Sequence, residues 1–258
     1  MSYSYLRDVN PIKHVPNFIT SLNLLCGCLA IVSVNNGNPL VASYFVIAAA
    51  IFDFFDGFAA RMLKVSSAIG AELDSLADMV TFGVVPGLIL FHYLQQTIGI
   101  EVNNIDTFLQ EPRLLIPFLI PVFSALRLAK FNVDTRQSDS FRGLPTPASA
   151  LWVISVPLII EFMPFHIWWE PENVIVEQWF ILSTSIGLSI LMVSDIPLLA
   201  LKFKSFGWKG NEFRYVFLII SVVLLIILQP LAIPIILSLY VFLSVINNLV
   251  NKPNEIQS

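Results

Sequence analysis

Four aspartates stand at helical spacings within apolar parts of the chain. Asp53 and Asp56 are three residues apart, and Asp74 and Asp78 are four apart. Residues three or four apart share one face of a helix, so each pair would project from one side of its helix. A charged residue near the centre of a membrane helix costs at least about 2.5 kcal/mol, so carboxylates in such segments indicate a functional site.

The residue types in this cluster favour a hard divalent cation. Converging carboxylates repel one another unless a counter-charge is present. Their oxygens are hard ligands, and no Cys or His lies among them, which favours Mg²⁺ or Mn²⁺ over zinc or copper. Salt bridges to Arg61 and Lys64 are the alternative. Gly57, Ala60 and Gly70 lie on the same faces, where small residues admit a ligand or allow close helix packing.

The composition indicates a membrane protein. Of the 258 residues, 56% are hydrophobic and 12% are charged, about half the charged fraction of a typical soluble domain. The net charge of −4, without a basic tract, argues against a nucleic-acid partner. The positioning elements should therefore be membrane helices.

The sequence predicts an all-α fold, a polytopic transmembrane helical bundle with about eight spans. Each span needs about 20 mainly apolar residues. Gln229-Pro230 would join the last two spans in a tight hairpin or one bent re-entrant pair. The predicted spans are Phe18–Val34, Pro39–Met62, Ser67–Leu94, Leu114–Phe131, Thr146–Pro164, Trp179–Leu201, Tyr215–Leu228 and Leu231–Leu249.

The basic residues predict the orientation. An even number of spans places both termini on one side, and that side then carries every Lys and Arg except Arg113. Short cytoplasmic loops retain positive charge. We therefore expect both termini and the acidic cluster to face the cytoplasm, with the chain in a bacterial inner membrane.

The acidic pattern resembles a known signature. Asp53-x2-Asp56-Gly57-x2-Ala60-Arg61-x8-Gly70-x3-Asp74-x3-Asp78 matches that of the CDP-alcohol phosphotransferase family at every specified position. The resemblance implies a homodimeric enzyme with a six-helix core that transfers a phosphoalcohol group from a CDP-linked substrate to a hydroxyl and releases CMP. We accordingly expect a catalytic core at residues 1–202 and a two-helix extension at 203–258.

The same resemblance implies roles for individual residues. Two divalent cations, Mg²⁺ or Mn²⁺, would be held by Asp53, Asp56, Asp74 and Asp78, with Asp78 also the candidate general base. Pro16-Asn17-x2-Thr20-x2-Asn23 is similar to a family segment beside the nucleotide. The residues assigned to CDP binding are Asn17, Thr20, Asp56, Gly57, Ala60, Arg61 and Gly70.

Further motifs are similar to the membrane-embedded, serine-using branch of the family. They are Glu72–Asp78 with Phe82-Gly83-x2-Pro86, Ala125–Asn132, and Phe141–Ala148. This likeness implies that the substrates are CDP-diacylglycerol and L-serine, and that the products are phosphatidylserine and CMP. The candidate acceptor or phosphate ligands are Glu72, Arg127, Lys130, Asn132 and Arg142. Asp195, after Leu191-Met-Val-Ser194, departs from the branch pattern.

Two other functions share the acidic cluster. A relative using glycerol 3-phosphate or inositol phosphate would differ only in the acceptor pocket. An ion or proton transporter would also place acids in the membrane, but it should carry polar residues through the bilayer depth, and the fourth to eighth spans supply few.

Overall fold

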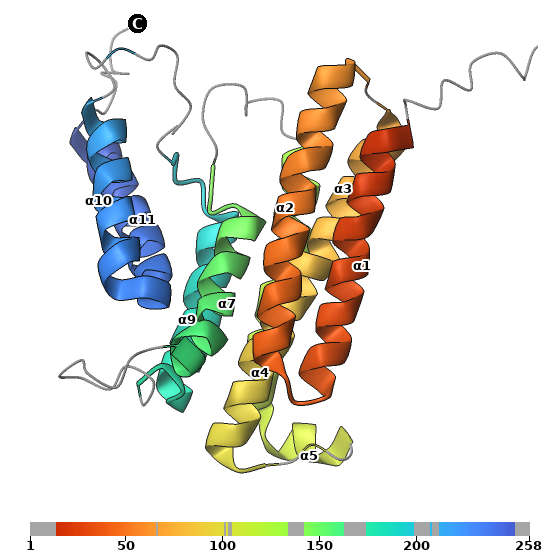
Figure 1. Ribbon diagram of the computed structural model, residues 1–258. Helices are drawn as coiled ribbons and strands as arrows, with labels where there is room; N and C mark the ends of the chain where they lie inside the picture. Colours follow the sequence, from red (N-terminus) through yellow and green to blue (C-terminus); the bar gives the residue numbers. More distant parts are fainter. Residues whose placement is uncertain are drawn as a thin grey trace, which may run out of the picture.

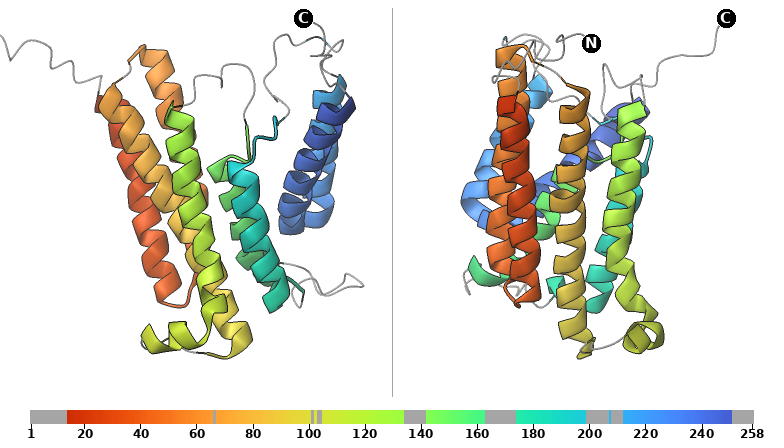
Figure 2. Two further views of the ribbon diagram at one scale, coloured as in Figure 1. Left: turned by 180° about the vertical axis from the view of Figure 1, so that it is seen from behind. Right: turned by 90° about the vertical axis from the view of Figure 1, so that its right-hand side faces the viewer.

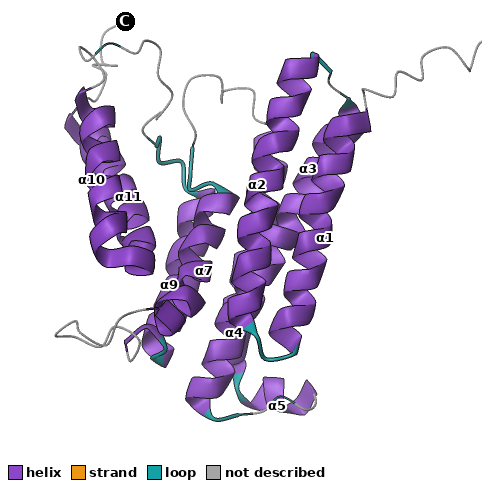
Figure 3. Ribbon diagram, in the orientation of Figure 1, coloured by secondary structure: helices purple, strands orange, loops and turns teal. Residues whose placement is uncertain are grey.

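The computed structural model describes residues 14–65, 67–100, 102, 105–133, 142–162, 174–198, 207 and 212–250. Within these ranges the chain is helical, with an isolated antiparallel bridge between Arg142 and Pro197 (Figure 3). The basic residues Arg7, Lys13, Arg136, Lys202, Lys204, Lys209 and Lys252, and Phe141 of the last motif, lie outside the described part. The elements are α1 (Val15–Asn35), α2 (Pro39–Leu63), α3 (Ala68–Asp78), η3 (Met79–Val84), α4 (Val85–Ile98), α5 (Ile105–Gln110), η4 (Pro112–Phe118), α6 (Leu119–Val133), α7 (Thr146–Phe162), α9 (Gln178–Val193), α10 (Glu212–Leu228), η5 (Gln229–Leu231) and α11 (Ala232–Val250).

The helices form the expected membrane bundle (Figure 1). The long apolar helices and two shorter ones, α7 and α9, follow one another along the chain in the order of the predicted spans. The prediction of an all-α polytopic bundle is therefore confirmed. The count of eight spans stays a prediction. Five described stretches are long and apolar enough to cross a membrane, namely Val15–Asn35, Pro39–Leu63, Ala68–Ile98, Pro112–Val133 and Tyr215–Ile246, the last of which contains α10 and α11.

The first two helices form an antiparallel hairpin that returns the chain to the end where it began (Figure 1). Gly37 has φ +75° in the turn, a left-handed conformation that glycine adopts without strain. At the other end of α2, Lys64 closes the helix in the left-handed region. The chain then re-enters the bundle at Ser67, whose side chain accepts a hydrogen bond from the Gly70 amide and caps α3.

The third span runs through three segments without a break. An α-helical start, α3, passes into the π-helical segment η3 and then into α4. The sequence predicted a single helix here and gave no sign of the wide turn, which begins directly after Asp78. Such π segments are frequent at functional sites.

This third span is the centre of the bundle. In an apolar stretch of 18 residues within this span, 56% of the residues are buried, against 11% in the corresponding stretch of α10 and α11. Phe82, Ile89, Leu90 and Leu94 are almost fully buried within the core. The central span therefore carries Asp74 and Asp78, while the C-terminal hairpin lies at the edge (Figure 2).

Two features differ from the sequence prediction. The sixth span ends at Val193 and not at Leu201, because the chain becomes extended at Ser194 and residues 194–198 are not helical. Pro197 in that segment lacks an amide donor and cannot continue the helix ladder. The short helix α5, at the bundle end opposite the start of α1, was not predicted (Figure 1).

The C-terminal hairpin packs on the core through one side. Residues of η5 and α11 contact α7, and a pocket of about 400 Å³ lies between α11 and the pair α7 and α9. The hairpin is distant from the start of α1 and α3 (Figures 1 and 2). The division into a core at 1–202 and an extension at 203–258 stays a prediction.

Candidate active and metal site

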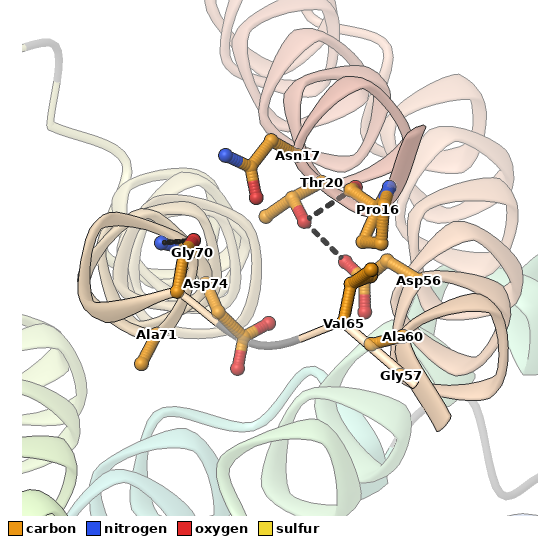
Figure 4. Close-up of a pocket in the computed structure, with 11 residues that line it drawn as sticks. Pro16, Asn17, Thr20, Asp56, Gly57, Ala60, Val65, Gly70, Ala71 and Asp74 are labelled. Carbon is orange, nitrogen blue, oxygen red and sulfur yellow. Dashed lines mark hydrogen bonds between the residues drawn. The ribbon is translucent and has the colours of Figure 1, made fainter. Parts of the chain in front are cut away.

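The start of α1, the last turns of α2 and the start of α3 lie together at one end of the bundle (Figure 1). They enclose a pocket of about 220 Å³, shown in Figure 4. Seven residues predicted at the site line it: Asn17, Thr20, Asp56, Gly57, Ala60, Gly70 and Asp74.

Three of the four aspartates converge. One carboxylate oxygen from each of Asp53, Asp56 and Asp74 lies within 4.8 Å of the other two. Two oxygens that share one ion are at most about 4.2 Å apart around Mg²⁺ and about 5.2 Å apart around Ca²⁺, so these oxygens lie near the upper limit for one shared ion. The three carboxylates therefore fit a hard divalent cation, as their chemistry also requires.

Asp78 is placed differently from the other three. It is 8% exposed, lies outside the convergent group, and accepts a 3.4 Å hydrogen bond from Asn23 Nδ2. It is nevertheless within electrostatic range of Asp53, Asp74 and Asp56. Asp78 is thus a buried carboxylate beside the cluster.

The hydroxyl of Thr20 fixes one member of the cluster. It donates to Asp56 Oδ2 at 2.7 Å and lies 3.0 Å from the carbonyl oxygen of Pro16 (Figure 4). Thr20 and Asp56 are 3% and 6% exposed. Since little water can reach this pair, the hydrogen bond orients the carboxylate and links α1 to α2.

The close approach of α1 and α3 at Gly70 shapes another wall of the pocket. A Cβ added to Gly70 would lie 2.9 Å from both Asn17 Oδ1 and Ser67 Oγ. That is too close for real contacts, so a larger residue here would displace the Asn17 amide and the Ser67 hydroxyl. Both proposed uses of small residues, close packing and pocket space, therefore occur here, because Gly70 also lines the pocket.

Arg61 lies next to the pocket and does not line it. Its Nη1 would be 3.4 Å from a Cβ added to Gly57, so the guanidinium passes beside that glycine. Arg61 and Lys64 are both exposed. Among the described side chains, the ion pairs are Arg113–Glu111 and Lys130–Asp195, and the salt-bridge alternative for the four aspartates gains no support.

The end of α6 brings several candidate acceptor residues near the cluster. Arg127 is 7% exposed, is within electrostatic range of Asp78, and its Nε has no hydrogen-bond partner. Asn132 donates to Ser75 Oγ at 3.0 Å, which ties α6 to α3 directly after Asp74. Lys130 instead pairs with Asp195 at 2.7 Å.

None of the five candidate acceptor residues is among those that line the pocket. Glu72 is exposed and is not among the residues that line it. It follows Gly70 and precedes Asp74 by two positions, about 200° around the helix, so it faces away from both. Arg142 is half-buried and bridges to Pro197 through its backbone.

The sequence reasoning missed some residues of the site. Ser67, Val65 and Ala71 also line the pocket, and Asn23 bonds Asp78. Asn23 could have been found, because it shares a helical face with Pro16 and Thr20 in the quoted pattern. Nothing in the sequence distinguishes Val65 or Ala71.

The described fold and site define a polytopic membrane protein with a candidate divalent-metal centre at one end of its helices. The family profile described as CDP-alcohol phosphatidyltransferase matches residues 13–246. The chain belongs to this family, so the earlier resemblance is confirmed.

Relatives from distant organisms carry one name. A Helicobacter pylori protein, 32% identical over 241 residues, covers 92% of each chain. A Bacillus subtilis protein is 35% identical over 145 residues, 55% of this chain and 74% of its own. One from Saccharomyces cerevisiae is 34% identical over 192 residues, 66% of this chain and 63% of its own. Each is named CDP-diacylglycerol–serine O-phosphatidyltransferase.

Proposed function

We propose that this membrane-embedded enzyme transfers the phosphatidyl group of CDP-diacylglycerol to L-serine, giving phosphatidylserine and CMP. The observation that carries the proposal is the convergence of the Asp53, Asp56 and Asp74 carboxylates at a pocket on one end of the bundle. Family membership supplies the CDP-linked substrate. The names of the relatives support serine as the acceptor.

Two divalent cations, Mg²⁺ or Mn²⁺, would be held by Asp53, Asp56 and Asp74, with Asp78 completing the set that the family signature implies. When bound, such ions neutralise charge on the diphosphate and stabilise the leaving oxygen. Thr20 holds Asp56 in the orientation that this requires.

The nucleotide side of the substrate would occupy the pocket between α1, α2 and α3. Gly57, Ala60 and Gly70 provide space along its wall, and Asn17 offers an amide. Arg61, beside Gly57, is a charge partner for a phosphate oxygen, which a guanidinium binds well. The diacylglycerol part would extend into the surrounding bilayer.

Asp78 is the proposed general base. The serine hydroxyl oxygen attacks the phosphorus that bears diacylglycerol, the bond from that phosphorus to the CMP oxygen breaks, and the hydroxyl proton passes to Asp78. Its position outside the three converging carboxylates supports this role, because a contact of Asp78 with the ions that is looser than theirs would leave its carboxylate able to accept a proton.

The acceptor would enter from the side of α6. Arg127 is suited to its carboxylate, since a buried guanidinium with a free donor can form paired hydrogen bonds. Asn132 and Lys130 lie along the same helix end. Arg142 and Glu72, which do not line the pocket, remain candidate ligands of the acceptor.

The sidedness of the described basic residues supports the proposed orientation. Arg61 lies in the last turn of α2, at the bundle end that carries the pocket, and Arg127 lies in the second half of α6, whereas Arg113 is the second residue of η4, which follows α5 at the other end. Positive charge concentrates on the cytoplasmic side. We therefore place the pocket and both termini in the cytoplasm, in a bacterial inner membrane, and we retain the homodimer that the family resemblance predicts.

The test is CMP release by the purified protein. CDP-diacylglycerol and Mn²⁺ or Mg²⁺ are supplied with L-serine, glycerol 3-phosphate or inositol phosphate in turn. We expect release with serine only, and phosphatidylserine as the lipid product. Release with glycerol 3-phosphate but not with serine would reject the acceptor, and ion flux into liposomes that survives Asp78→Asn would favour a transporter.

A further inference from the structure

The segment after α9 is held by backbone hydrogen bonds to the residues that precede α7. Leu144 N donates to Leu191 O at 2.9 Å, and Gly143 N donates to Ile196 O at 3.0 Å. Gly143 has φ +73°, and a Cβ there would collide with the carbonyl oxygens of α9. Asp195 therefore has a fixed backbone position, although its side chain is 64% exposed.

Asp195 faces α6 from this segment. Its Oδ1 lies 2.7 Å from Nζ of Lys130, whose side chain is 40% exposed. Exposed ion pairs contribute little to stability, about 0–1 kcal/mol. Both charges remain accessible to water, so a soluble molecule can reach the carboxylate.

Arg127 supplies an opposite charge close by. It precedes Lys130 by three residues, which is a rise of about 4.5 Å along the helix. It is buried, its Nε lacks a hydrogen-bond partner, and it is within electrostatic range of Asp78. An unpaired guanidinium donor thus lies one helical turn before the lysine that pairs with Asp195, and it is also within electrostatic range of Asp78.

We propose that Asp195 binds the α-ammonium group of the acceptor amino acid while Arg127 binds its carboxylate, so that the side-chain hydroxyl points toward Asp78. This inference rests on the proposed serine transfer and names the residue that selects its acceptor. Lys130 is a positioning residue, because it holds the Asp195 side chain on the α6 side.

The charges of the rival acceptors make Asp195 selective. An amino acid carries an ammonium and a carboxylate, whereas glycerol 3-phosphate and inositol phosphate carry a phosphate and no ammonium. Asp195 attracts the first kind of acceptor and repels the second, and such repulsion is an effective means of rejecting wrong partners.

The experiment measures CMP release by Asp195→Asn with L-serine and with 3-hydroxypropanoate, which is serine without its ammonium group. We expect the KM for serine to rise at least about tenfold, as for loss of a charge-assisted hydrogen bond. The wild-type preference for serine over 3-hydroxypropanoate in kcat/KM should fall by the same factor. The KM for CDP-diacylglycerol and the Tm should not change.

Three further variants control for a structural role. Asp195→Glu should keep most of the preference for serine. Glu111→Gln breaks the exposed pair with Arg113 at the opposite end and should change nothing. The charge reversal Lys130→Asp with Asp195→Lys keeps an ion pair, yet should not restore the KM for serine.

An unchanged serine preference in Asp195→Asn overturns the inference. The inference is also overturned if Asp195→Asn raises the KM for serine and the KM for CDP-diacylglycerol and lowers the Tm, and if the charge reversal restores all three. That pattern would show that the Lys130–Asp195 pair only holds α6 and the segment after α9 together. If wild type releases no CMP with serine, the proposed function itself fails. If wild type does so and Asp195→Asn behaves like it, only the present inference fails.

Discussion

Replacing Thr20 by Val tests how the cluster is held in place. Valine keeps the branched shape and removes the hydroxyl that donates to Asp56 Oδ2 at 2.7 Å. At 3% exposure for Thr20, water cannot easily replace the lost donor. The Asp56 carboxylate would lose its orienting partner.

The expected size of the effect follows from that single contact. A hydrogen bond to a charged group contributes about 1.5–3 kcal/mol, and 1.4 kcal/mol corresponds to a tenfold change in binding. Thr20→Val should therefore raise the Mn²⁺ concentration for half-maximal activity by about 10- to 150-fold. Loss of a partner that orients a metal ligand typically has a similar effect.

The assay is CMP release across a Mn²⁺ titration, with Tm measured on the same preparations. Thr20→Ser keeps the donor and should stay near wild type. Ser43→Ala is the matched control, because Ser43 is buried and its hydroxyl donates to the Pro39 carbonyl oxygen, remote from any carboxylate of the cluster. A Thr20→Val protein with wild-type Mn²⁺ dependence would refute the reasoning.

Three further substitutions separate the roles in the site. Asp56→Asn should abolish CMP release in a folded protein, because a carboxamide carries no charge to hold the metal; retained turnover at ordinary Mn²⁺ would remove Asp56 from the site. Asp78→Asn should lower kcat by about 10²- to 10⁴-fold, the usual contribution of a general base, and should change the Mn²⁺ concentration for half-maximal activity less. A large change in that Mn²⁺ concentration with a small change in kcat would instead make Asp78 a metal ligand. Gly70→Ala should raise the KM for CDP-diacylglycerol, because its Cβ would lie 2.9 Å from Asn17 and Ser67 and such overpacking costs about 1–3 kcal/mol; an unchanged KM would show that the wall yields freely.

The fold class and the core of the site could be predicted because their signals are local. Apolar length and Pro or Gly breaks mark membrane helices, and the spacing of Asp53, Asp56 and Asp74 places them on facing sides of adjacent helices. A short connection limits how far the end of α2 can lie from the start of α3, and in the structure both helices pack against α1. This arrangement agrees with the observed convergence of the three carboxylates.

Other features depend on contacts between distant segments. The hydrogen bond of Asn23 to Asp78 and the ion pair of Lys130 with Asp195 join residues 55 and 65 positions apart. The π-helical turn follows Asp78 directly, and the segment after the early end of α9 forms a backbone bridge with Arg142. No helical period encodes such pairings, so the sequence could identify the residues and not their partners.

The central claim is that carboxylates from α2 and α3 bind divalent cations. It is tested most directly by the anomalous scattering of Mn²⁺ in crystals of the active protein grown with that ion. We expect Mn²⁺ peaks within coordination distance of Asp53, Asp56 and Asp74 oxygens. Crystals of protein that is active under the same conditions, with no peak between α2 and α3, would contradict the account.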